Sequence, residues 1–93
     1  MNPEKRYKLY SKALNKWGVH SQVGMLYEEL GELIVSINKY SRSVNNVELD
    51  KVIDEIADVE IMTEQYCYIF GIMREKIELV KDVKLNRLKE MLK

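Results

Sequence analysis

The sequence predicts an all-α fold, and three features of the chain indicate it. The single proline, Pro3, lies at the very start, where a helix tolerates it. Apolar residues recur at intervals of three and four along most of the chain, which is the period of one helix face. No stretch alternates apolar and polar residues as a half-buried strand would.

Four helices are expected along the chain. The first runs from about Pro3 to Trp17, and Gly18 ends it. The second runs from about Ser21 to Tyr40 and carries an apolar stripe formed by Leu26, Leu30, Leu33, Ile34 and Ile37. The polar stretch 41–46 is a loop, and either Asn45 or Asn46 can cap the helix that follows it.

The third predicted helix, from about Val47 to Phe70, is apolar over much of its circumference, which indicates a central, buried position. Gly71 separates it from a fourth, amphipathic helix that ends at about Met91. A chain of 93 residues has the size of one domain, so we expect a single helical domain over 1–93, built as a four-helix bundle. Its high apolar content makes a homo-oligomer plausible, because a chain this small buries only about 60–65% of its unfolded surface.

The charges are balanced overall but unevenly distributed. With 15 basic and 15 acidic residues, the net charge is zero, which argues against a nucleic-acid or membrane-surface binder. Residues 1–27 hold five basic residues and one acidic residue; residues 28–64 hold three and ten, and residues 65–93 hold seven and four. An acidic middle segment therefore lies between two basic ends.

One cysteine, Cys67, excludes both an internal disulfide and a cysteine-rich zinc site. The N-terminal segment has no apolar signal core, and no apolar run is long enough to span a membrane. The expected location is the cytoplasm, with no membrane partner.

Two pairs of carboxylates lie on or beside the apolar faces of the second and third predicted helices. With a helical step of about 100° per residue, Glu29 falls at the edge of an apolar stripe, and Glu32 follows one turn later. Glu55 points out of the middle of a stripe, and Asp58 follows it at the same spacing. An ionised carboxylate in such a position costs several kcal/mol unless a positive charge meets it.

Four carboxylates from neighbouring helices would repel one another unless a cation lay between them, and hard oxygen ligands suit Mg²⁺ or Mn²⁺. One such pair alone is more often a solvated helix face. The coincidence of two pairs favours a metal site, although Glu60 also lies on an apolar side and belongs to no pair.

The string Glu28-Glu29-Leu30-Gly31-Glu32, followed after 22 residues by Glu55-Ile56-Ala57-Asp58, resembles the E-E-x-x-E…E-x-x-D signature of the MazG-like all-α nucleoside-triphosphate pyrophosphohydrolases. That superfamily includes the dimeric dUTPases and the phosphoribosyl-ATP pyrophosphohydrolases. The resemblance extends from Trp17-Gly18 through Gln22 to Lys84-Leu85-Asn86-Arg87.

The resemblance implies a Mg²⁺-dependent enzyme that cleaves NTP or dNTP between the α and β phosphates, giving a nucleoside monophosphate and pyrophosphate. It assigns the metal to Glu29, Glu32, Glu55 and Asp58, and catalytic roles to Glu28 and Glu29. It also implies assembly as a homodimer or homotetramer. Substrate contacts are expected from Gln22, Lys84, Asn86 and Arg87.

Several alternatives stay open. Basic residues near a helix C-terminus often only complement the helix dipole, and Gln22 can be an ordinary polar residue at a helix start. A di-iron bundle is not indicated, because the Glu-x-x-His motif is absent. The alternatives to an enzyme are a non-catalytic helical interaction protein and a nucleotide-binding regulator.

Overall fold

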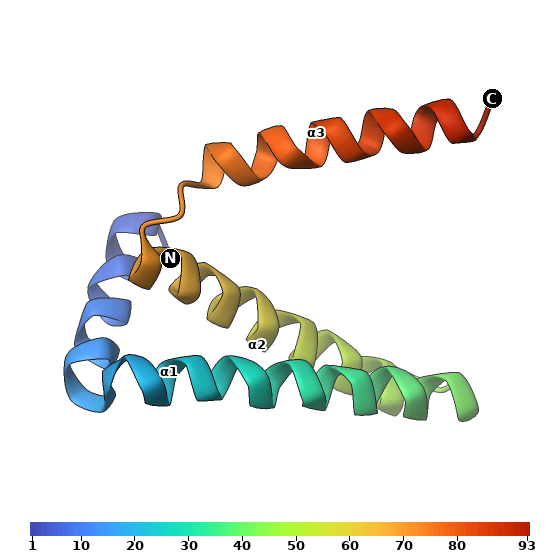
Figure 1. Ribbon diagram of the computed structural model, residues 1–93. Coiled ribbons are helices and arrows are strands. Elements are labelled where there is room, and N and C mark those ends of the chain that lie inside the picture. Colours follow the sequence, from blue (N-terminus) through green and yellow to red (C-terminus); the bar gives the residue numbers. More distant parts are fainter.

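The computed structural model describes residues 1–93 and contains three α-helices and no strand (Figure 1). These helices are α1 (Pro3–Arg42), α2 (Asn46–Phe70) and α3 (Arg74–Met91). The predicted all-α class is confirmed. The prediction of four helices is not met, because the first two expected helices are the two arms of α1.

Gly18 is the reason for the difference. The backbone of Gly18 (φ 83°, ψ 163°) is not helical, but the residues before and after it are, and no loop separates the two helical segments. The N-terminal arm is therefore turned sharply against the rest of α1 (Figure 1). Only glycine adopts this combination of angles readily, so the expected break lies at the expected residue but produces a kink instead of a helix end.

The helix ends follow local chemistry. The side chain of Asn2 accepts a hydrogen bond from the backbone N–H of Lys5 at 2.8 Å, with Pro3 in the first turn. The side chain of Asn45 caps α2 in the same way, accepting from the N–H of Glu48 at 2.9 Å. Gly71 ends α2 in the left-handed conformation (φ 66°), as the sequence predicts.

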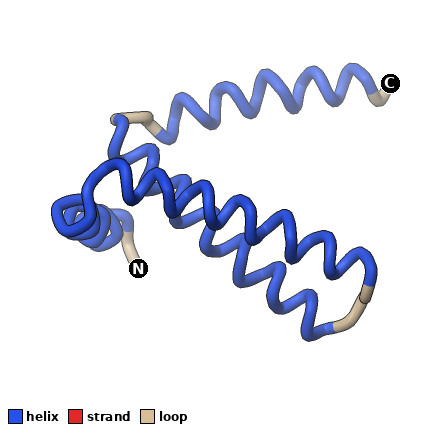
Figure 2. Tube along the Cα trace, turned by 60° about the horizontal axis from the view of Figure 1, so that its bottom comes forward, coloured by secondary structure: helices blue, strands red, loops and turns tan.

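The second arm of α1 and α2 form an antiparallel helical hairpin (Figures 1 and 2). Gln22 and Gln65 are buried where the two helices meet. The N-terminal arm crosses the C-terminal half of α2, where the phenol of Tyr10 donates a hydrogen bond to Glu64 and the ring of Tyr7 stacks on that of Tyr68 at 5.7 Å.

The third helix stands apart from this hairpin (Figure 1). Helix packing is confined to α1 and α2 apart from a marginal contact, and no residue of α3 is buried. One chain alone therefore does not form the predicted bundle. The expected burial of the third predicted helix is also wrong for one chain, since Gln65 is the only buried residue of α2.

None of the three helices combines the length and apolar character that a membrane-spanning helix requires.

Candidate metal centre

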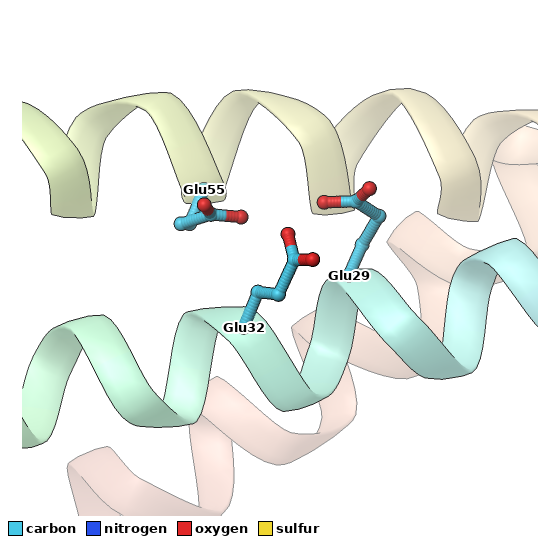
Figure 3. Close-up of side chains that lie close together, drawn as sticks. All are labelled: Glu29, Glu32 and Glu55. Atoms are coloured by element: carbon cyan, nitrogen blue, oxygen red, sulfur yellow. The ribbon is translucent and has the colours of Figure 1, made fainter.

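Three carboxylates from the two helices of the hairpin converge on one point. Glu29 and Glu32 project from the second arm of α1, and Glu55 projects toward them from α2 (Figure 3). One oxygen from each lies within 4.8 Å of the oxygens of the other two. The spacing of three residues places the α1 pair on one side of its helix, and antiparallel packing brings Glu55 opposite.

Two of these carboxylates are only partly accessible to solvent. One oxygen of Glu29 and one of Glu55, in both cases Oε2, are buried and have no hydrogen-bond partner. A buried polar atom without a partner is unfavourable, so something outside the chain is expected to satisfy these oxygens. Lysine and arginine do not do so, because none of the salt bridges of the chain involves the three glutamates.

The electrostatics of the cluster agree with this geometry. Burial raises the pKa of Glu29 to about 7, and the charges of the neighbouring carboxylates add to the effect. Burial also raises the pKa of Glu55, followed by the charges of Glu32 and Asp58. Crowded carboxylates that resist ionisation are an environment in which a divalent cation is favourable, because it removes the repulsion and supplies the missing partner.

Asp58 and Glu28 lie at the edge of the cluster. Asp58 is exposed and close enough for its charge to raise the pKa of Glu29 and Glu55, but it is outside the set whose oxygens lie within 4.8 Å. Glu28 is also exposed and makes no hydrogen bond or ion pair within the chain. Of the four predicted ligands, the structure thus gathers three at one point and leaves the fourth beside them.

The exposed carboxylates share one side of the hairpin. At about 100° per residue, Glu28 and Glu32 lie some 80–120° from the middle of the α1 face that packs on α2, and Asp58 is displaced similarly on α2. The two right-handed helices run antiparallel, so displacements in the same rotational sense bring Glu28, Glu32 and Asp58 to the same face of the hairpin. The cluster therefore opens to solvent on this carboxylate face, formed by Glu28, Glu32 and Asp58.

Gln22 has a structural partner, Gln65, that the sequence pattern does not predict. Its side-chain oxygen accepts a hydrogen bond of 2.9 Å from Nε2 of Gln65, and both residues are buried. The only signal for Gln65 in the sequence is a polar residue on a helix face whose neighbours, Met62 and Ile69, are apolar. A contact between Gln22 and substrate would have to compete with this hydrogen bond.

The basic residues expected to hold phosphates lie elsewhere. Lys84, Asn86 and Arg87 are exposed on α3, which leaves the hairpin near the C-terminal end of α2 (Figure 1). Since α3 does not pack along the hairpin, one chain does not bring these side chains to its own carboxylates.

No protein-family model, curated protein sequence or solved structure matches this chain. The evidence for its function therefore consists of the residues, their geometry and the signature that they form.

Proposed function

We propose that the protein is a Mg²⁺-dependent nucleoside-triphosphate pyrophosphohydrolase, with Mn²⁺ as a possible substitute. Water would be added across the α–β anhydride bond of an NTP or dNTP, giving a nucleoside monophosphate and pyrophosphate. The observation that carries the proposal is the convergence of Glu29, Glu32 and Glu55 from two helices, with buried oxygens that lack a partner. The resemblance of the two acidic motifs supplies the reaction.

The position of each carboxylate suggests its role, either in binding the cation or in accepting a proton. Glu29, Glu32 and Glu55 would hold the cation, with Asp58 completing the set from the edge of the cluster. A divalent cation bound there would offset the charge of the triphosphate, polarise the α-phosphate and lower the pKa of the attacking water. Glu28 is exposed, unpaired and adjacent to the cluster, so its carboxylate is available to accept a proton, with Glu29 as the other candidate.

Phosphate binding requires positive charge, and no lysine or arginine of the chain is paired with the glutamates of the cluster. Lys84 and Arg87, with Asn86 between them, are the candidates, and they lie on a helix that projects away from its own hairpin. We propose that they serve the site of another copy in a homodimer or homotetramer. No nucleic acid or membrane takes part, and the cytoplasm remains the location expected from the sequence.

The direct test is hydrolysis of a panel of NTPs and dNTPs with Mg²⁺ or Mn²⁺, followed by separation of the products. Monophosphate and pyrophosphate are expected. Absence of cleavage with either metal would contradict the proposal, and orthophosphate as the first product would indicate a different phosphohydrolase chemistry.

A matched pair of variants ties activity to the cluster. Glu55→Gln removes a proposed ligand and a crowded charge, so turnover should be lost while the helical circular dichroism spectrum is retained. Asp54→Asn removes the same charge from an exposed neighbouring position and should keep wild-type turnover. Full activity of Glu55→Gln would refute the assignment of the site.

The second candidate is a non-catalytic helical interaction protein. It is favoured by the many exposed apolar side chains, among them Ile34 at 70% and Ile53 at 56% exposure. Metal-dependent nucleotide binding without turnover would instead identify a nucleotide-binding regulator. Absence of both turnover and nucleotide binding would leave the interaction protein.

A further inference from the structure

A row of lysines runs along the N-terminal arm of α1, the segment from Pro3 to Trp17. This lysine row has spacings of three, four and four residues: Lys5, Lys8, Lys12 and Lys16. At about 100° per residue, the four side chains fall within about 80° of one another around the helix, and no other residue of the arm falls within that arc. All four are exposed. At a rise of about 1.5 Å per residue, the row is about 16 Å long.

The packing of the arm turns the lysine row toward solvent. Tyr10, which is the buried residue of the arm, lies about 160° from Lys12 around the helix. The phenol of Tyr10 and Nε of Arg6 both donate hydrogen bonds to the carboxylate of Glu64 on α2, at 2.9 and 2.7 Å. The arm is therefore held on α2 by one side, and the opposite side, which carries the lysines, faces outward.

The chain does not balance the charges of the row. Lys8 makes one long ion pair with Glu4, at 3.8 Å, between two exposed side chains, and such a pair contributes little. The other three lysines make no ion pair, although Nζ of Lys16 lies 5.3 Å from the ring centre of Trp17. Like charges four residues apart destabilise a helix, and Lys12 has such a neighbour on each side. An anionic partner along the row would remove this repulsion.

The zero net charge of the chain conceals this surface. Residues 1–27 hold five basic residues and one acidic residue, Glu4, and the acids that balance them belong mainly to residues 28–64. The arm contacts α2 at Glu64, nine residues after Glu55, which corresponds to about 13 Å along the helix. The lysine row is therefore a surface separate from the carboxylate cluster, and the argument from net charge does not apply to it.

We propose that the lysine row binds the phosphate backbone of duplex DNA without reading its bases. Charge complementarity is the reason, because duplex DNA carries one negative charge for about every 1.7 Å of its axis, and lysines that neutralise its phosphates release condensed counterions. The row has the length of about five nucleotide steps of one strand at about 3.4 Å each, so several phosphates lie within reach of the four ammonium groups. The inference goes beyond the proposed hydrolysis, in which no nucleic acid takes part.

Three features of the arm favour duplex DNA over other anionic partners. An acidic protein would need an apolar centre for its interface, and the arc of the row contains only lysines. An anionic membrane would need the apolar side of the arm, which is already packed on α2 through Tyr10. A single strand is held by aromatic side chains that stack on its bases, and the row contains none.

Fluorescence anisotropy with a labelled DNA duplex of about 20 base pairs tests the proposal. The full chain is measured with EDTA and without nucleotide, so the result does not depend on the proposed metal site or hydrolysis. Binding is expected at about 50 mM salt, equally for duplexes of unrelated sequence. The logarithm of the association constant should fall with the logarithm of the salt concentration with a slope of about −3.6, because each of four phosphate contacts contributes about −0.9. Absence of binding at this salt concentration would overturn the proposal.

A matched pair of variants locates the surface. Lys12→Gln/Lys16→Gln removes two of the four charges, so it should halve the salt slope and weaken binding by roughly a hundredfold at about 50 mM salt. Lys39→Gln/Lys76→Gln removes the same charge from exposed positions outside the arm and should keep the wild-type affinity. Both variants change exposed side chains and should keep the helical circular dichroism spectrum. Wild-type affinity of Lys12→Gln/Lys16→Gln would refute the assigned surface.

Two further ligands distinguish duplex DNA from the other anionic partners. A single strand of the same length should bind more weakly than the duplex, because its charge density is lower and the row offers no stacking side chain. Vesicles that contain anionic phospholipid should not bind, because the apolar side of the arm is occupied. Tighter binding of the single strand, or binding of the vesicles in place of the duplex, would overturn the choice of duplex DNA.

Discussion

The side-chain amide of Gln65 donates a hydrogen bond of 2.9 Å to Oε1 of Gln22, and this buried pair joins α2 to the second arm of α1. The pair lies in the same interface as the carboxylate cluster. A hydrogen bond at this position sets the register of the two helices that supply Glu29 and Glu55, so the alignment of the site depends on it.

Gln65→Leu should therefore lower the free energy of unfolding by about 1–3 kcal/mol, because it leaves the buried amide of Gln22 without its partner. The double variant Gln22→Leu/Gln65→Leu should recover part of that loss, since neither polar group remains. Urea unfolding monitored by circular dichroism measures both. If Gln22 also contacts substrate, Gln22→Leu should raise KM more than Gln65→Leu does; equal effects on KM would assign Gln22 to structure alone.

Gly18 allows a contrasting pair of glycine substitutions. Gly18→Ala should destabilise the fold by about 1–3 kcal/mol, because its backbone (φ 83°, ψ 163°) is strained for any residue with a Cβ. Gly24→Ala, within the helical second arm and with nothing within 4 Å of the added Cβ, should stabilise it by about 0.5–1 kcal/mol. Thermal unfolding compares the two; equal effects would mean that the kink at Gly18 is not part of the fold.

Tyr10 should titrate at a higher pH than is usual for a tyrosine. Burial, together with its hydrogen bond to Glu64, raises the pKa of Tyr10 to about 12 from 10.0. The folded protein then retains a proton that the unfolded chain releases, so stability is full below pH 10 and falls as the pH rises toward 12. Tyrosinate absorbance measures the titration, and Tyr10→Phe should remove the late step. A wild-type titration without it would contradict the packing of the N-terminal arm.

The carboxylate cluster should make the stability of the metal-free protein depend on pH in the acidic range, between pH 4.5 and about 7. The folded state holds a proton on Glu29 up to a pKa of about 7, whereas the unfolded chain releases it near 4.5. The stability that Glu29 contributes is therefore fully present below pH 4.5 and is lost as the pH rises to about 7. Mg²⁺ at neutral pH should restore stability, because it binds the ionised carboxylates of the folded state.

Thermal unfolding at a series of pH values, with Mg²⁺ and with EDTA, measures this effect. Glu29→Gln is the matched variant, since it removes the titrating group and one ligand together. It should flatten the pH dependence and remove the response to Mg²⁺. A wild-type midpoint that Mg²⁺ leaves unchanged at neutral pH would argue against a metal site.

The local features of the fold could be predicted from the sequence because short-range chemistry determines them. Apolar spacing predicts the helices, and Gly71 predicts the end of α2. The start of α2 is predicted at Asn45 or Asn46, and Asn45 is the residue that caps it. The pairing of Glu29 with Glu32 follows from the helical period alone. Their approach to Glu55 could be expected only on the assumption that the two helices are neighbours, which the hairpin provides.

What the sequence by itself determined is which residues share a helix face, because a helix has a fixed period whatever surrounds it. Only the tertiary structure decided that Gly18 bends one helix instead of ending it, that Gln22 is hydrogen-bonded to Gln65, and that α3 does not pack along the hairpin. These three features depend on how segments distant in the sequence pack together. The same helical pattern allows several such arrangements, and small differences in burial select one of them.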